Sequence, residues 1–294
     1  MTWTPELVAL DVDGTLVDES NIVAPSVRDA VRRVVDAGVP VLLSTGRSWS
    51  SAVTIVDQLA LPPVEHVCSN GAVSVRYPPF EVVDVFTFDP RPVTQRILAE
   101  HPSALLAVEV VGRGYRVTDL FPVGELHGEI EVVGLDDLAA ADVTRVIVRD
   151  PASSEQEFIE LAHRLGLEGV SYAIGYTAWL DIAPDGVDKA HGLARVTSRM
   201  GVDASRVLAI GDGRNDVEML AWAGRGVAMG HAPGELLAVA DAVTGTLDEG
   251  GLVAELGRSR MLAYLLSGEC ASASELARTA SVTQCRRCSS RRPR

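Results

Sequence analysis

The sequence predicts an α/β protein with a parallel sheet, because short apolar runs alternate with amphipathic segments over much of its 294 residues. Apolar runs at 7–10, 39–43 and 207–210 each stop abruptly at polar residues, as buried parallel strands do. Between residues 82 and 181 this alternation is lost and β-rich pieces dominate. We therefore expect a Rossmann-like parallel-sheet core that is interrupted by an inserted α+β domain.

The first part of the core is predicted to alternate strands and helices. In order, these are a strand at 7–10, a helix at 24–37, a strand at 39–43, a helix at 48–59 and a strand at 66–68. The first helix has valines at helical spacing and ends at Gly38, and Leu61-Pro62-Pro63 breaks the pattern after the second. Helices that follow strands in this way pack on the faces of a parallel sheet.

The inserted domain, the cap, is predicted at 85–183, which leaves a core of 1–84 and 184–262. Its β-rich pieces are expected at 82–88, 105–111, 115–118 and 143–148, with a helix at 154–165. Gly, Pro and acidic turns separate these pieces, as in an antiparallel sheet. Residues 184–262 then return to alternating helix and strand.

The C-terminal residues 263–294 are predicted to form a disordered tail, because they are rich in Ser, Ala and Arg and lack periodic apolar positions. Three of the four cysteines lie there, at Cys270, Cys285 and Cys288. The Cys285-x-x-Cys288 pair has no second Cys or His pair nearby, so we do not expect a metal site. Cys68 is expected to be a small buried residue.

The pentapeptide Asp11-Val12-Asp13-Gly14-Thr15 follows the first strand directly. Two carboxylates one residue apart repel each other near a dry core, unless a cation or a charged transition state compensates them. Taken alone, the pentapeptide is also compatible with a surface turn carrying two solvated aspartates. A calcium loop of the EF-hand type is excluded, because its twelfth position needs an acidic ligand and here holds Ile22.

A second acidic cluster follows the run at 207–210, in Gly211-Asp212-Gly213-Arg214-Asn215-Asp216. If the two strands are neighbours in the sheet, four Asp side chains face one cavity beyond its carboxyl edge. Such a concentration of negative charge implies a divalent cation. Ligands that are all oxygen favour Mg²⁺ over a transition metal.

Two further segments supply donors and positive charge. Ser44-Thr45-Gly46-Arg47 follows the strand at 39–43 and offers a hydroxyl, an unobstructed backbone N–H and the positive end of the next helix. This combination suits a phosphoryl oxygen. Lys189 begins a predicted helix. A single Lys in a helix is usually solvated, so its function depends on its neighbours.

Together these segments resemble the four motifs of the haloacid dehalogenase-like (HAD) superfamily, in the same order. The segments are Asp11-x-Asp13-Gly14-Thr15, Thr45-Gly46-Arg47, Lys189 and Gly211-Asp212-Gly213-x-Asn215-Asp216. Ser69-Asn70-Gly71-Ala72 and residues 180–187 are similar to the Cof-type sugar-phosphatase branch, which carries a C2-type cap. The resemblance covers residues 6–257.

The resemblance implies a hydrolase, a phosphatase that forms an aspartyl-phosphate. Asp11 would attack phosphorus, and Asp13 would protonate the leaving oxygen and then deprotonate the attacking water. Mg²⁺ would be bound by Asp11, the backbone carbonyl of Asp13 and Asp212, with Asp216 close by. The phosphoryl oxygens would be bound by Thr45, Gly46, Arg47, Lys189 and Asn215.

The composition of the chain restricts the classes of molecule that it is expected to bind. The net charge of −14 argues against general nucleic-acid binding and against adsorption to anionic membranes. No apolar run has the length of a membrane span, and the N-terminus lacks the pattern of a signal peptide. We expect a cytoplasmic metal-binding enzyme, a monomer or weak dimer, that acts on a small phosphorylated metabolite such as a sugar phosphate.

Two other functions use the same motifs. A phosphosugar mutase would return the phosphoryl group to another hydroxyl of the sugar. A non-catalytic binding protein on this fold would be expected to lack Asp11 or a metal-binding Asp, and all of them are present. Dinucleotide binding fails, because Asp216 occupies the place of the third glycine of that fingerprint.

Overall fold

The computed structural model describes residues 3–165, 170–174 and 179–258. A five-stranded parallel sheet forms the core, in the order β14-β13-β12-β1-β2. Its strands are β1 (Leu7–Leu10), β2 (Val41–Leu43), β12 (Val207–Gly211), β13 (Arg225–Ala228) and β14 (Ala242–Val243). The predicted parallel α/β core is thereby confirmed, and the strands that precede the two acidic clusters are neighbours.

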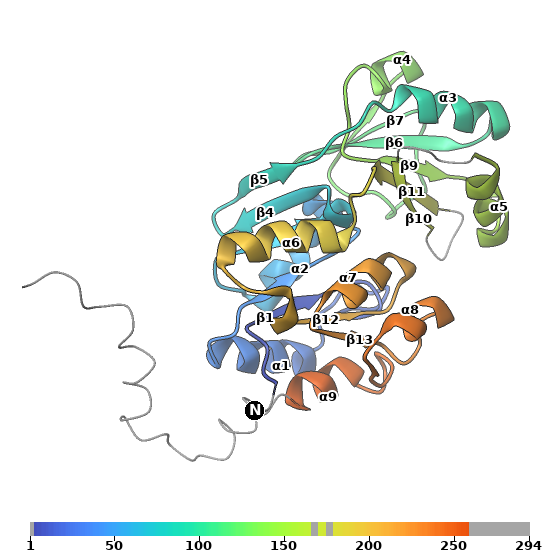
Figure 1. Ribbon diagram of the computed structural model, residues 1–294. Helices are drawn as coiled ribbons and strands as arrows, with labels where there is room; N and C mark the ends of the chain where they lie inside the picture. The colour runs from blue at the N-terminus through green and yellow to red at the C-terminus, as the bar shows by residue number, and fades with distance from the viewer. Residues whose placement is uncertain (1–2, 166–169, 175–178, 259–294) are drawn as a thin grey trace, which may run out of the picture.

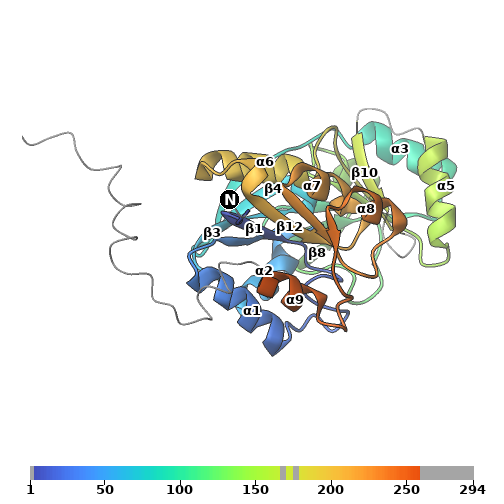
Figure 2. The same ribbon diagram turned by 60° about the horizontal axis from the view of Figure 1, so that its bottom comes forward.

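Helices cover both faces of this sheet, as Figure 2 shows. One face carries α1 (Pro25–Asp36), α2 (Trp49–Leu59) and α9 (Gly251–Arg258), and the other carries α6 (Lys189–Met200), α7 (Val217–Trp222) and α8 (Gly234–Val239). Alternate residues of β1 serve the two faces: Val8 and Leu10 belong to the first apolar cluster, and Leu7 and Ala9 to the second. Both faces are dry, which explains why β1 has no polar residues.

A three-stranded antiparallel sheet lies next to β2 and consists of β3 (Val64–Cys68), β4 (Val73–Tyr77) and β5 (Glu81–Val85). The Thr45 N–H donates to the carbonyl of Val67 at 2.9 Å, which joins β3 to the end of β2. The β-rich piece predicted at 82–88 corresponds in part to β5, which ends at Val85 and pairs with β4. These strands follow each other as hairpins, so no intervening helix signals them.

The inserted α+β region is built on a six-stranded sheet with the order β10-β11-β9-β6-β7-β8. Its strands are β6 (Leu105–Val110), β7 (Gly114–Val117), β8 (Glu129–Val132), β9 (Val146–Arg149), β10 (Val170–Ile174) and β11 (Trp179–Pro184), and its helices are α3 (Arg91–Glu100), α4 (Leu135–Leu138) and α5 (Glu155–Leu165). Figure 1 shows it at the end of the molecule opposite α1 and α9. It has its own apolar cluster, which includes Ile97, Leu106 and Phe158.

The chain passes between the core and this region at two places. After β5, the Phe86 N–H still donates to Ala72 of the smaller sheet at 2.8 Å, whereas Phe88 bridges to Val143 of the inserted region. The return runs through β11 directly to α6. We retain 85–183 as the proposed extent of the cap.

Some sequence predictions concern residues outside this description. The tail predicted at 263–294, with its three cysteines, lies outside the described residues. Within the described part of the chain, no helix combines the length and apolar character that a membrane span requires. Cys68 is buried, as predicted.

Candidate active site

An acidic triad forms where β1 and β12 end. The two strands pair in parallel with Leu10 opposite Ile210, so Asp11 and Asp212 leave the sheet side by side. Carboxylate oxygens of Asp11, Asp212 and Asp216 lie within 4.8 Å of one another, and all three residues are buried. After β1 the chain continues to β2 on one side of the sheet, and after β12 it continues to β13 on the other side. The triad therefore lies at the switch point, where the strand order reverses.

Lys189 is the only lysine in the sequence, and it lies inside the triad. Its Nζ donates to Oδ1 of Asp11 and to Oδ1 of Asp216, each at 2.6 Å, and its side chain is fully buried. The residue begins α6, and Asp188 caps that helix by accepting from the His191 N–H at 2.8 Å. The cap fixes the first turn of α6 and thereby the direction in which Lys189 leaves it.

Two backbone features hold the triad in place. Oδ2 of Asp216 accepts from the N–H groups of Asp212 at 3.0 Å and Gly213 at 2.9 Å, which fixes the loop after β12. Gly14 has a φ of +78°, and a Cβ there would lie 2.1 Å from Oδ2 of Asp212. Only glycine combines this backbone conformation with this close approach.

The electrostatics of the triad favour a cation. Burial and repulsion from Asp216 raise the pKa of Asp212 to about 6, and the same two causes raise the pKa of Asp11 well above its usual value. Burial alone would lower the pKa of Lys189, but attraction by Asp11 and Asp216 outweighs it and raises that pKa. The ammonium of Lys189 thus pairs with two of the three carboxylates, and Nε2 of His231 lies 3.3 Å from Oδ2 of the third, Asp212. A divalent cation would relieve the remaining repulsion, and the all-oxygen donor set fits Mg²⁺.

Asp212 should make the stability of the protein depend on pH when no metal is bound. Its pKa is raised from 3.8 to about 6 on folding, so its unfavourable contribution is absent below about pH 4 and complete above about pH 6. In EDTA, Asp212→Asn is therefore expected to be more stable than the wild type at pH 7.5 by up to about 3 kcal/mol. Urea unfolding from pH 4 to 7.5 measures this gap, which should close toward pH 4. The exposed Asp18→Asn is the control, and an equal gain there would contradict the assignment.

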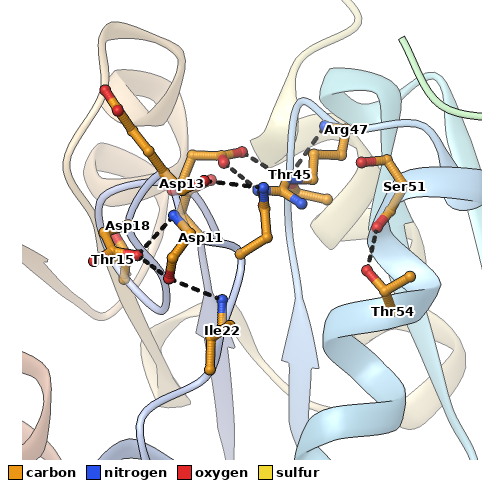
Figure 3. A network of polar contacts seen from close by, with 12 residues as sticks. Asp11, Asp13, Thr15, Asp18, Ile22, Thr45, Arg47, Ser51 and Thr54 are labelled. Atoms are coloured by element: carbon orange, nitrogen blue, oxygen red, sulfur yellow. Dashed lines mark hydrogen bonds and ion pairs between the residues drawn. The ribbon is translucent and has the colours of Figure 1, made fainter. Parts of the chain in front are cut away.

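Asp13 leaves the sheet edge in a different direction from Asp11. Its side chain is 62% exposed and forms a two-pronged ion pair with Arg47, in which Nε donates to Oδ2 at 2.9 Å and Nη2 contacts Oδ1. Figure 3 shows this carboxylate facing the guanidinium. The Arg47 side chain is 12% exposed and also contacts Asn21. In this conformation Arg47 therefore binds a carboxylate of the first motif.

The remaining predicted phosphate ligands lie around the same space. Thr45 is buried, and its Oγ1 accepts from the Arg47 N–H at 3.1 Å. Nδ2 of Asn215 donates to Oδ1 of Asn70 at 2.9 Å. Asn70 was not among the predicted site residues, although Ser69-Asn70-Gly71 was a visible signal. Its φ of 51° turns it out of β3 toward Asn215.

A cavity of about 250 Å³ lies between the triad and the inserted region. Asp11, Asp212 and Asn215 line its core side, and Tyr115, Arg145, Trp179 and Asp181 are among the residues that line the opposite side. Nη1 of Arg145 donates to the carbonyl of Gly46 at 2.6 Å, so this residue of the inserted region contacts the Thr45-Gly46-Arg47 motif of the core. Sequence reasoning missed Arg145, because a single Arg within a β-rich piece has no pattern that marks it.

Acidic strand ends at the switch point of a parallel sheet, covered by an inserted α+β region, are the arrangement of a haloacid dehalogenase-type hydrolase. The sequence profile of haloacid dehalogenase-like hydrolases matches residues 8–100 and 127–256, and the chain belongs to that family. Both the expected family and its fold are thereby confirmed.

Several relatives that match most of the chain are named as phosphatases. The chain is 30% identical over 253 residues to a phosphoglycolate phosphatase of Natronomonas pharaonis, covering 86% of this chain and 97% of that protein. It is 28% identical over 269 residues to the 5-amino-6-(5-phospho-D-ribitylamino)uracil phosphatase YitU of Bacillus subtilis, covering 86% and 96%. A solved HAD phosphatase from Bacteroides thetaiotaomicron shares 29% identity with a TM-score of 0.72, covering 88% and 96%. This protein is accordingly a phosphatase that acts on phosphate monoesters.

Proposed function

We propose that the protein is a Mg²⁺-dependent phosphatase that hydrolyses a small phosphate monoester, such as a sugar phosphate, through an aspartyl-phosphate on Asp11. The observation that carries the proposal is the environment of Asp11: a buried carboxylate bonded to Lys189, within an acidic triad, that lines the cavity beneath the inserted region. An ammonium at 2.6 Å favours the ionised carboxylate that a nucleophile must be.

In the first step an oxygen of Asp11 forms a bond to phosphorus, and the phosphorus–oxygen bond of the ester breaks. The leaving oxygen takes the proton of the Asp13 carboxyl group. In the second step a water molecule loses a proton to Asp13 and attacks the same phosphorus. The acyl-phosphate bond breaks, so phosphate leaves and Asp11 returns as a carboxylate.

The Asp13 carboxylate must leave its ion pair with Arg47 before it can act on the leaving oxygen. A phosphoryl dianion bound beside Arg47 would compete with Asp13 for the guanidinium. Once released from Arg47, the Asp13 carboxyl group is free to turn toward the leaving oxygen. Binding of the substrate would thus prepare the acid.

The other groups divide between the metal and the phosphoryl oxygens. Mg²⁺ would be held by the carboxylates of Asp11 and Asp212 and the backbone carbonyl of Asp13, with Asp216 beside them, and would neutralise charge between nucleophile and phosphate. The phosphoryl oxygens would be bound by Thr45, Gly46, Arg47, Lys189 and Asn215, as the sequence motifs suggested. A monomer or weak dimer in the cytoplasm remains a prediction of the sequence.

Trapping of the intermediate tests this proposal. The Asp13→Asn variant lacks the base of the second step, but p-nitrophenyl phosphate has a leaving group that needs no acid. With this substrate and Mg²⁺, the variant is expected to release a burst of about one nitrophenolate per enzyme and then to slow. Acid quenching and mass spectrometry should locate the phosphoryl group on Asp11. A variant that turns over steadily without a phosphorylated Asp11 would refute the intermediate.

A further inference from the structure

The cap side of the cavity carries a buried guanidinium between two carboxylates. Arg145 lies 3.3 Å from Asp181 and 3.5 Å from Glu109, and the exposed fraction of its side chain is 4%. It also contacts the hydroxyl of Tyr115. The positive charge of Arg145 is therefore more than balanced within its own neighbourhood. Among the described residues lining this side, it is the only guanidinium.

The arginines that line the cavity elsewhere are also paired. Within the described residues these are Arg47, which is bonded to Asp13, and Arg214, whose Nε lies 3.0 Å from Glu235. On the cap side Glu125 adds a second carboxylate to the wall and is itself bonded to Arg149 at 2.9 Å. Among the described residues that line the cavity outside the phosphoryl site, every guanidinium already has a carboxylate partner. The leaving group of a bound substrate would therefore contact no unpaired guanidinium there.

Asp181 is the acceptor best placed on this wall. It belongs to β11 and lines the cavity, and 15% of its side chain is exposed. The Trp179 indole donates to its Oδ2 at 3.1 Å, while Arg145 contacts its Oδ1. Burial raises the pKa of Asp181, and both of these donors oppose that effect. The carboxylate is thus held in one orientation, with lone pairs remaining for a ligand.

We propose that Asp181, oriented by Arg145 and Trp179, determines specificity by accepting hydrogen bonds from the leaving group. The substrate is then a phosphate ester whose leaving group carries hydroxyl or ammonium donors and no second anion. This inference rests on the proposed function, since it places the leaving group against the cap wall. A carboxylate or second phosphate there would approach Asp181 and Glu125 without a free cation, and the low dielectric strengthens that repulsion.

Two esters that differ only in one charged group test the proposal. Sorbitol 6-phosphate and 6-phosphogluconate share one carbon chain, which ends in a hydroxymethyl group in the first and in a carboxylate in the second. With the full chain and Mg²⁺ we expect kcat/KM to be at least about tenfold higher for sorbitol 6-phosphate. Both compounds are also measured as competitive inhibitors of p-nitrophenyl phosphate hydrolysis, so their ratio is obtained even where turnover is slow.

Variants assign the preference to Asp181. Asp181→Asn removes the charge and keeps the shape, and is expected to bring the ratio of the two esters to within about threefold of one. Asp181→Glu keeps the charge and should retain a preference in the same direction. Glu131→Gln removes one charge from an exposed position on β8 and should leave the ratio unchanged.

The outcomes separate this inference from the proposed function. Equal use of the two esters by the wild type, or a preference for 6-phosphogluconate, overturns the inference while the phosphatase proposal stands. A preference that persists in Asp181→Asn overturns the role of Asp181. Failure of the wild type to hydrolyse p-nitrophenyl phosphate with Mg²⁺ would refute the proposed function itself, and the inference with it.

Discussion

Asp11→Asn is expected to abolish turnover and to lower kcat for p-nitrophenyl phosphate by far more than about a hundredfold. An amide oxygen is a poor nucleophile, and no other carboxylate of the triad emerges from β1. The fold should persist, because the substitution keeps the shape and removes a buried negative charge that repels Asp212 and Asp216. Phosphate release under saturating substrate, with circular dichroism as a check of folding, measures the effect.

The matched control is Asp18→Asn. Asp18 lies a few residues further along the same loop, where its carboxylate accepts from the Ser20 N–H at 2.9 Å in an exposed position. Its loss should change kcat less than about twofold, since it touches none of the triad residues. Release of more than about a hundredth of the wild-type phosphate by Asp11→Asn would remove Asp11 as the nucleophile.

The convergence of the acidic clusters could be predicted from the sequence because its cause is local. Asp11 and Asp212 each follow a wholly apolar run, and parallel strands place their carboxyl ends at the same edge. Strands that are buried on both faces are easy to recognise in a sequence, because they form continuous apolar runs. β4, β5 and β8 gave weaker signals or none, and β8 is an exposed edge whose glutamates pair with arginines of the neighbouring segment.

The side chains contributed by the cap could not be predicted in the same way. Arg145 owes its position to contacts with Gly46, Glu109 and Asp181, which are distant in sequence, and nothing in its immediate neighbours indicates them. The ion pair of Asp13 with Arg47 is likewise a tertiary contact. Asn70 is an intermediate case, since a turn after β3 was visible although its direction toward Asn215 was not.

Lys189→Met should cost both stability and activity, because it leaves Asp11 and Asp216 buried without their ammonium. Breaking a buried ion pair from one side typically costs about 3–5 kcal/mol, and methionine fills a similar volume without replacing the charge. We expect a loss of that size in the free energy of urea unfolding at pH 7.5, and a fall in kcat/KM of more than about a hundredfold.

The pH dependence of this loss distinguishes a charge effect from a packing effect. Without Lys189 the folded-state pKa of Asp11 should rise further, because the ammonium is what lowers it. The destabilisation is therefore small below about pH 4, where this carboxyl group is protonated, and grows as the pH rises. Arg195→Met removes a charge from an exposed site of the same helix and should cost less than about 1 kcal/mol at any pH. A loss in Lys189→Met that is equally large at pH 4 and pH 7.5 would show that Lys189 acts through packing. In that case Lys189 would not be the group that keeps the Asp11 nucleophile ionised.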